Sequence, residues 1–356
     1  MMMGMASALE RKLIVVTGKG GVGKTTVSAA LGLLGARRGL RTIVVEVTGG
    51  EAGNDAAGTG RLAALLGHCE PPPHGVEVEL QEGLLWGLSI DRDRVLAEWL
   101  RALGGRVPAR VLTSSSSFQY LIAAAPGARE MISMVKVWEL AQGRRPADRE
   151  SRGKSPAEGA RGYDLVVLDA PATGHALAML RSPQTFSTVA RMGPIARQSG
   201  QVRELLEDPA RSAYLAVAQA TEMGVTETLE LRESLRRELG RELHAVVVNG
   251  ALPQRFDGGE LQRIASLGGG APSGGRAAGA RNGYRDAGAD AVTRSAVRAA
   301  HAVHTRARTQ QRQLARLRRG AGPHGSPLVL RVPFLFRGEL DLEAVQRIAN
   351  GLERGL

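Results

Sequence analysis

The segment GKGGVGKT, residues 18–25, constrains this chain more than any other stretch of its 356 residues. It places four glycines and two lysines between the apolar run LIVV (13–16) and the helix-like run TTVSAALGLLGARR (25–38). Glycines let the backbone curl so that successive N–H groups point inward, and a following helix adds partial positive charge at its first turn. A strand, a glycine loop and a helix in this order predict a cradle for a phosphate chain.

The spacing of this loop fits the P-loop pattern G-x-x-x-x-G-K-[ST]. In such a loop Lys24 reaches the outer phosphates and the Thr25 hydroxyl binds Mg²⁺. We therefore expect ATP and Mg²⁺ as ligands, and the cradle to consist of Gly18, Gly20, Gly21, Val22, Gly23, Lys24, Thr25 and Thr26. A chance glycine turn is the alternative, and the flanking strand and helix argue against it.

Continuous apolar runs predict strands that are buried on both faces, as in a parallel sheet. These runs are KLIVVT (12–17), RTIVVEV (41–47), YDLVVLDA (163–170), LHAVVVNG (243–250) and PLVLRVPF (327–334). The fold class is therefore α/β, a mostly parallel sheet flanked by helices, and we expect residues 1–356 to form a single ATPase domain.

The connections between the strands are uneven in length. Those at about 60–140 and 175–240 exceed a simple crossover helix and predict an inserted α-helical subdomain. Segments 143–162 and 257–290 are rich in Gly, Pro, Ser and charge and predict disordered-like surface loops. The arginine-rich run 292–320 has partly helical apolar spacing and predicts a helix with a solvated face.

Composition limits the partners. The net charge is +12, but only five of the 47 basic residues are lysines, the arginines are scattered among Ala and Gly, and aromatic residues make up 3%. We therefore expect no nucleic-acid partner. The single cysteine, Cys69, leaves no disulfide framework and no cysteine-pair zinc site within one chain. Without a long apolar run or an export signal, the expected location is the cytoplasm.

The second lysine of the loop, Lys19, follows the first glycine directly. The sequence GKGGVGKT resembles the deviant Walker A motif of the dimeric ATPases related to MinD, the nitrogenase iron protein and the arsenical pump ATPase. This resemblance implies that Lys19 crosses a homodimer interface to the partner's nucleotide, where its charge would act as an arginine finger does elsewhere. The alternative is an exposed lysine at a loop tip.

The segment DLVVLDAPATGHALAML (164–180) narrows the family. It places Asp169 at a strand end, where a carboxylate can hold Mg²⁺. The run is similar to the D-[TS]-A-P-T-G-H-T-L-R segment of the ArsA-type arsenite-pump and tail-anchored-protein-targeting ATPases. Segments 125–140, 180–186 and 205–231 also resemble this family, the last its D-P helix pair. The resemblance further implies that Asn249 reads adenine and that Pro333 lies in the loop that closes over the base.

The first switch departs from the family pattern, which carries a water-orienting aspartate after the second strand. Thr48 falls at that position, and threonine cannot act as a carboxylate base. Glu46 falls where many relatives carry a first acid, and we count it with Lys19, Lys24 and Asp169 as a catalytic candidate. Glu46, Glu51 or Asp55 would have to stand in for the aspartate. We expect slow turnover, or a hydrolysis-impaired, nucleotide-gated binding module.

The residues Met131, Met134, Val135 and Trp138 recur at helical spacing. The resemblance places this helix in a subdomain that forms a groove for a hydrophobic client helix in the targeting ATPases. Packing inside the subdomain is the alternative, and we favour it. A hydrophobic client helix or a membrane protein is thus an expected partner. A MinD- or ParA-like partition ATPase would share the loop but does not account for segment 164–180.

Overall fold

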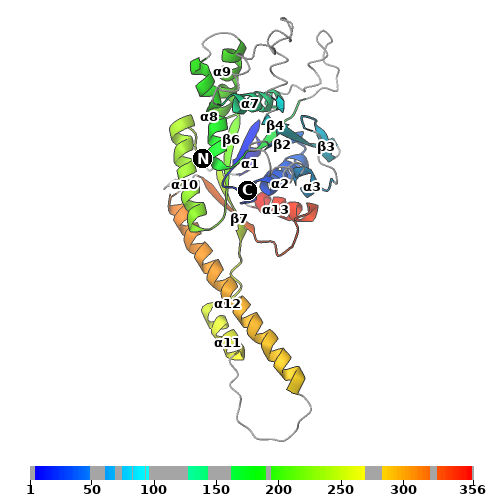
Figure 1. Ribbon diagram of the computed structural model, residues 1–356, viewed down its shortest axis with the longest axis vertical. Helices are drawn as coiled ribbons and strands as arrows, with labels where there is room; N and C mark the ends of the chain where they lie inside the picture. The colour runs from blue at the N-terminus through cyan, green and yellow to red at the C-terminus, as the bar shows by residue number, and fades with distance from the viewer. Residues whose placement is uncertain are drawn as a thin grey trace.

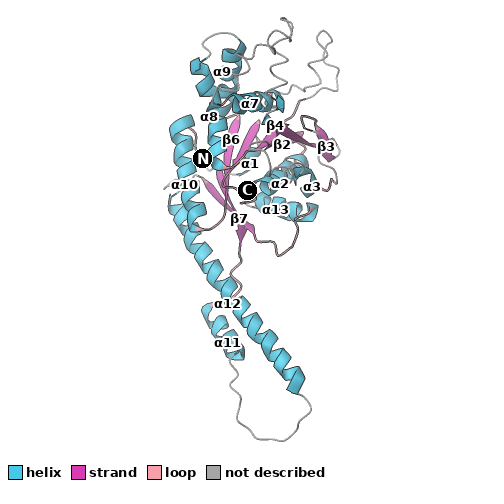
Figure 2. Ribbon diagram, viewed as in Figure 1, coloured by secondary structure: helices cyan, strands magenta, loops and turns pink. Residues whose placement is uncertain are grey.

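A computed structural model describes residues 5–48, 61–68, 74–81, 83–92, 94–95, 127–142, 162–189, 194–268, 283–320 and 327–354. Figure 1 shows one central sheet with helices on both faces and a long helix that leaves this body. The strands occupy the middle layer in Figure 2. A central sheet between two helical layers is the arrangement that continuous apolar strands require.

The described strands form one eight-stranded sheet in the order β3-β4-β2-β5-β1-β6-β7-β8. Their bounds are β1 Leu13–Thr17, β2 Thr42–Thr48, β3 Val78–Gln81, β4 Leu85–Asp91, β5 Leu165–Asp169, β6 Ser212–Ala218, β7 Ala245–Ala251 and β8 Leu328–Pro333. All neighbours pair in parallel except β3 with β4. The predicted α/β fold with a mostly parallel sheet is confirmed, and each of the five predicted strands is present.

Helices cover both faces of the sheet. One face packs against α1 Met5–Leu9, α2 Lys24–Arg37, α3 Arg61–Leu65 and α13 Leu342–Arg354. The other face packs against α7 Ala128–Ala141, α8 Thr173–Val189, α9 Pro194–Glu207, α10 Glu222–Leu239 and the last turns of α12 Gly283–Gly320. Helix α11 Gly258–Gly268 lies beside α12, away from the sheet (Figure 1). Alternate residues of β1 serve the two cores, Ile14 and Val16 one, Leu13 and Val15 the other.

Helix α2 follows the glycine loop and is buried from Thr26 to Ala36. Two of its glycines explain how it lies so close to the sheet. A Cβ at Gly32 would lie 2.4 Å from Val44 Cγ2, and one at Gly35 would lie 2.6 Å from Thr42 Oγ1. These two glycines therefore allow the second half of α2 to pack directly against β2.

The expected helical subdomain is only partly correct. Residues 60–140 contain the strands β3 and β4, and residues 205–231, which resemble a helix pair, contain β6. β6 is buried at every position between β1 and β7, so it belongs to the centre of the sheet. Its sequence SAYLAVA is alanine-rich and lacks the β-branched run that marks the other strands. Helices α7, α8 and α9 do pack against one another as a helical layer.

The expected loop 257–290 is also wrong in part, because α11 and the beginning of α12 lie within it. Asp257 and Glu260 explain the start of α11, since each accepts a hydrogen bond from the other's backbone N–H. Residues 269–282 and nearly all of the expected loop 143–162 lie outside the described residues. The helix expected within 292–320 is confirmed as part of α12.

The methionine stripe of α7 faces the core. Met131, Met134, Val135 and Trp138 are 8% exposed or less and pack in the cluster that covers the sheet. The packing alternative therefore holds for these side chains in this conformation. Among the described residues no helix combines the length and apolar character required to cross a membrane.

Candidate nucleotide-binding site

The site lies at the carboxyl ends of the central strands, where the chain leaves β1 for α2. Asp169 ends β5 and is 5% exposed. It accepts hydrogen bonds from Thr25 Oγ1 at 2.7 Å and from Ser28 Oγ at 3.1 Å. Ser28 was not among the predicted site residues, although it lies one helical turn after Thr25 and therefore on the same face of α2.

The loop itself uses glycine where other residues would be strained. Gly23 has φ +92°, and a Cβ there would lie 2.3 Å from Asn249 Nδ2. Gly18 has φ +143°, and a Cβ would lie 2.2 Å from the carbonyl oxygen of Val217 on β6. At Gly20 and Gly21 a Cβ would meet no described atom within 4 Å, so the loop is open on that side.

Helix α2 begins at Lys24 without a side-chain cap, so the N–H groups of its first turn have no intrahelical partner. Lys24 Nζ folds back and donates to the carbonyl oxygen of Lys19 at 3.0 Å. Burial lowers the pKa of Lys24, while the charge of Asp169 opposes this change. Uncapped amides and an ammonium group at one helix end form a site for an anion.

Glu46 of β2 is the register partner of Asp169 on β5, so the sheet brings the two carboxyl groups together. Burial and the nearby charge of Asp169 raise the pKa of Glu46 to about 8. Burial also raises the pKa of Asp169 to about 6, against the hydrogen bonds from Thr25 and Ser28. Without ligand, Glu46 therefore carries a proton near neutral pH, and Asp169 holds most of the negative charge.

Thr48 ends β2, and its hydroxyl donates to the carbonyl oxygen of Ile90 at 3.3 Å. It thus ties β2 to β4 and carries no group that could take up a proton. Glu51 and Asp55, the other candidates for the missing aspartate, lie outside the described residues. Of the three candidate acids, Glu46 is the one that the structure describes, and it is the register partner of Asp169.

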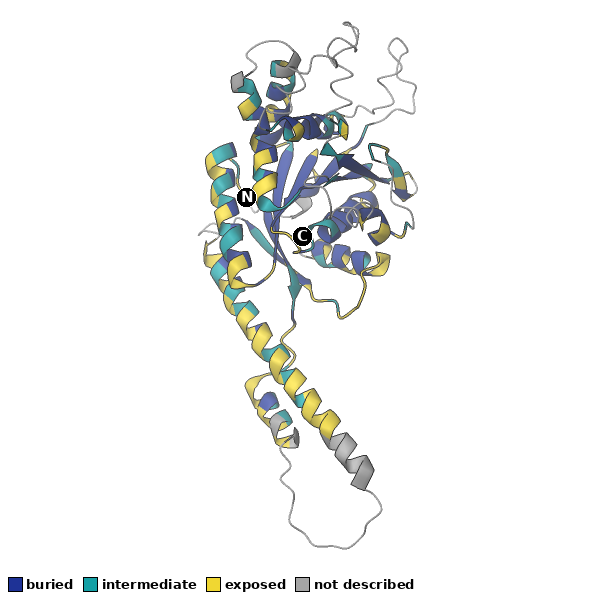
Figure 3. Cartoon of the chain, in the orientation of Figure 1, coloured by how far each residue is buried: buried dark blue, intermediate teal, exposed yellow. Residues whose placement is uncertain are grey.

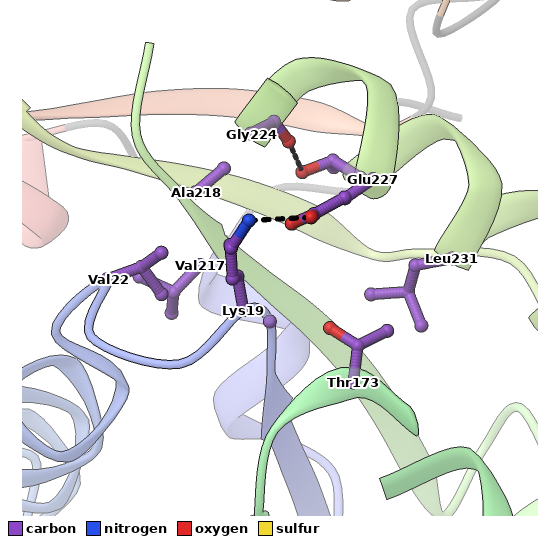
Figure 4. Close-up of a pocket in the computed structure, with 10 residues that line it drawn as sticks. Lys19, Val22, Thr173, Val217, Ala218, Gly224, Glu227 and Leu231 are labelled. Atoms are coloured by element: carbon purple, nitrogen blue, oxygen red, sulfur yellow. Dashed lines mark hydrogen bonds and ion pairs between the residues drawn. The ribbon is translucent and has the colours of Figure 1, made fainter. Parts of the chain in front are cut away.

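Lys19 is set apart from the other charged residues of the loop. Its ammonium group turns toward α10 and forms an ion pair with Glu227 Oε1 at 2.8 Å (Figure 4). Lys19, Glu227, Val22 and Thr173 are among the residues that line a small cavity between the loop and α10. Sequence reasoning missed Glu227, because 208 residues separate it from Lys19.

Asn249 and Pro333 lie at the ends of the neighbouring strands β7 and β8. Asn249 Nδ2 donates to the carbonyl oxygen of Val22 at 2.9 Å, so the side chain supports the glycine loop. Directly after Pro333, Phe334 and Phe336 are 46% and 59% exposed and pack edge to face with ring centroids 4.9 Å apart. In the sequence these two phenylalanines are marked only by their position, at the end of the run PLVLRVPF and directly after it.

The donors at Asp169 fit Mg²⁺, which prefers oxygen ligands and keeps several waters and phosphate oxygens in its shell. A buried carboxylate with two hydroxyl groups provides hard oxygens, and because burial disfavours its charged form and raises its pKa, a cation bound beside it would stabilise the carboxylate. No group of three or more His, Cys, Asp and Glu that could hold a metal occurs within the described ranges. A Mg²⁺ ion at Thr25 and Asp169 would therefore need phosphate and water to complete its coordination.

A glycine loop that opens a buried helix, with a lysine, a hydroxyl group and a strand-end aspartate around it, defines a P-loop nucleotide-binding protein. The family model described as the CobQ/CobB/MinD/ParA nucleotide binding domain matches residues 13–267. This chain belongs to that family.

Several curated proteins are similar to this chain. ATPase BagA of Mycobacterium tuberculosis is 29% identical over 261 residues, which are 71% of this chain and 69% of that protein. ATPase GET3C of Arabidopsis thaliana is 24% identical over 291 residues, 70% of this chain and 69% of that protein. The arsenical pump-driving ATPase of Acidiphilium multivorum is 25% identical over 257 residues, 67% of this chain and 39% of that protein. These relatives are named as ATPases, and they support an ArsA-like branch of the P-loop family for this chain.

Proposed function

We propose that this chain binds and hydrolyses Mg·ATP as a homodimer, and that nucleotide-driven closure of the two subunits acts on a client or membrane partner. The observation that carries the proposal is the contact of Asp169 with both Thr25 and Ser28 beneath the glycine loop. It joins the end of β5 to the first turn of α2, where phosphate oxygens and a cation would meet.

Bound Mg²⁺ supplies positive charge that offsets the charge of the phosphate oxygens. The chain's own groups position the phosphates. The amides of residues 20–26 face them, and Lys24 exchanges its hydrogen bond to the Lys19 carbonyl for one to a phosphate oxygen. Thr25 and Asp169 hold the cation. Glu46 holds its proton in the ligand-free chain, because burial and the charge of Asp169 raise its pKa to about 8.

The base has a candidate place beside the loop. Asn249 offers an amide oxygen, and its second N–H remains after the bond to Val22. Phe334 lies 3.7 Å from the position of a Cβ on Gly250, so the aromatic pair is next to Asn249. A planar base that lies against exposed aromatic rings and hydrogen-bonds to an amide is a common solution for purines.

Steady-state phosphate release from the purified chain tests the enzymatic part. We expect Mg²⁺-dependent turnover that Lys24→Ala abolishes and that Lys19→Ala also abolishes if the lysine acts across a dimer. Lys12→Ala is the matched control, since Lys12 lies before β1 and outside the loop.

A second reading is a nucleotide-gated binding module, and Thr48 is the observation that favours it. This case would be identified by tight Mg·ATP binding that is lost in Lys24→Ala, together with the absence of Lys24-dependent phosphate release. The nucleotide would then act chiefly as a ligand that stabilises the closed dimer. A partition ATPase of the MinD or ParA type remains the least favoured candidate.

A further inference from the structure

Helix α12 carries an unusual distribution of charge. Residues 291–320 contain eight arginines and neither aspartate nor glutamate. The carboxyl-terminal part packs on the body through Ala307, Leu314 and Leu317, which are buried. The amino-terminal part extends beyond the sheet, with α11 along one side (Figure 1), and its surface is largely exposed (Figure 3).

Six of the eight arginines lie on one face. At 3.6 residues per turn, Arg294, Arg298, Arg308, Arg312 and Arg319 fall within about 40° of a common direction, opposite the buried apolar face. All five are exposed. The stripe they form, from residue 294 to residue 319, is about 38 Å long.

These five side chains are available to a partner. Among the side chains that the structure describes, which do not include those of residues 283–290, no carboxylate lies within salt-bridge distance of any of them. By contrast, Arg316 on the same face donates to the carbonyl oxygen of Glu222 and to Thr226 Oγ1 on α10. Arg316 anchors the helix, and the other five form a row of exposed guanidinium groups that have no carboxylate partner among the described side chains.

The residues between the arginines narrow the class of partner. Exposed positions on this face include Ala302, Thr305, Thr309 and Ala315, which are small. The segment 291–320 contains no Phe, Tyr or Trp on which unpaired bases could stack, and the exposed His301 is the one imidazole on this face. Leu314 and Leu317 pack into the protein core, and the exposed Val292 lies on another side of α12, so the arginine face carries no large apolar side chain that could enter a bilayer.

We propose that the outer face of α12 binds the phosphate backbone of double-stranded nucleic acid without reading its sequence. Guanidinium forks match phosphate oxygens, and a rigid helix with small residues between its arginines can approach a duplex closely. The scattered arginines of the sequence gave no such expectation, because only the helix brings those of α12 to one side. The proposal does not depend on the nucleotide site.

The test is binding of a fluorescent DNA duplex of arbitrary sequence, followed by anisotropy over a series of salt concentrations. If all five arginines contact phosphates, log K falls against log salt with a slope approaching about −4.5. The variant Arg308→Gln/Arg312→Gln should lower the magnitude of this slope by about 2. The control Arg306→Gln/Arg318→Gln removes the same charge from exposed positions on other faces of α12 and should leave the slope nearly unchanged.

Three results would overturn the proposal. One is no duplex binding by the unaltered chain at low salt. Another is an equal loss in both double variants, which would show that net charge and not the stripe is responsible. The third is co-sedimentation with phosphatidylglycerol vesicles in the absence of duplex binding, which would identify a membrane surface instead.

Discussion

The ammonium group of Lys19 donates a hydrogen bond to Glu227 Oε1 of its own chain at 2.8 Å and forms an ion pair with it. The lysine that would serve a partner's nucleotide is thus bound to α10 in the single subunit. Its transfer across an interface requires this ion pair to break first. The pair is partly exposed, with side chains 44% and 33% accessible, so its strength is that of a surface contact.

The first prediction concerns this ion pair. Glu227→Gln releases Lys19 and should strengthen Mg·ATP-dependent dimerisation by up to about fivefold for each of the two ion pairs in the dimer, the range of an exposed salt bridge. Sedimentation equilibrium measures the dimer constant. Glu230→Gln is the control, because Glu230 is exposed on the same helix. A weaker dimer in the Glu227 variant would mean that the carboxylate serves the assembled state.

The loop glycines should differ sharply in tolerance. Gly23→Ala puts a Cβ into left-handed backbone and against Asn249, so unfolding free energy should fall by about 2 kcal/mol or more. Gly20→Ala has open space and should stay within about 0.5 kcal/mol of the unaltered chain. Urea unfolding compares the two. Equal losses would show that the loop is not held in this conformation.

Asn249 has two separable roles. Asn249→Ala removes the donor to the Val22 carbonyl and should weaken binding of any nucleoside triphosphate by up to about tenfold, the worth of one hydrogen bond. If the amide also reads adenine, the affinity for ATP falls further than that for GTP. Competition binding with both nucleotides measures this. An identical loss for ATP and GTP would leave Asn249 with the supporting role alone.

The carboxyl pair predicts a dependence of stability on pH. Because the pKa of Glu46 is about 8 in the fold, the folded chain binds more protons than the unfolded chain above the ordinary glutamate pKa. The unfolding free energy should therefore fall as pH rises from about 5 to about 8, by on the order of 3 kcal/mol. Chemical denaturation at several pH values measures this slope.

Two comparisons identify its source. Glu46→Gln should remove most of the fall in stability, and Glu79→Gln, at an exposed position of β3, should not. Mg²⁺ with a nucleotide should also reduce the fall, because a cation near Asp169 favours the charged carboxylates. Stability that rises over this pH range would contradict the pKa assigned to Glu46.

The sequence predicted the parts of this fold that depend on local pattern. The β-branched runs that form β1, β2, β5, β7 and β8 are recognisable because strands buried on both faces need continuous apolar residues. β6 was missed because SAYLAVA becomes a strand only through its place between β1 and β7. α11 was missed because a capped helix of 11 residues lies within a glycine-rich stretch.

The site also has residues that the sequence predicts and residues that only the fold reveals. The glycine loop, Lys24, Thr25 and Asp169 belong to patterns that a sequence displays, and the fold brings them together. Glu227 and the arginine stripe of α12 depend on tertiary packing and on helical phase, which composition does not convey. A stretch with scattered charge is therefore poor evidence against a binding surface.

The central claim is that residues 18–25 and Asp169 hold Mg·ATP, and isothermal calorimetry tests it most directly. We predict saturable heat with one nucleotide per chain, abolished by Lys24→Ala, and a loss of Mg²⁺ dependence in Asp169→Asn. The absence of any binding heat with millimolar Mg·ATP, or heat that Lys24→Ala leaves unchanged, would contradict the account.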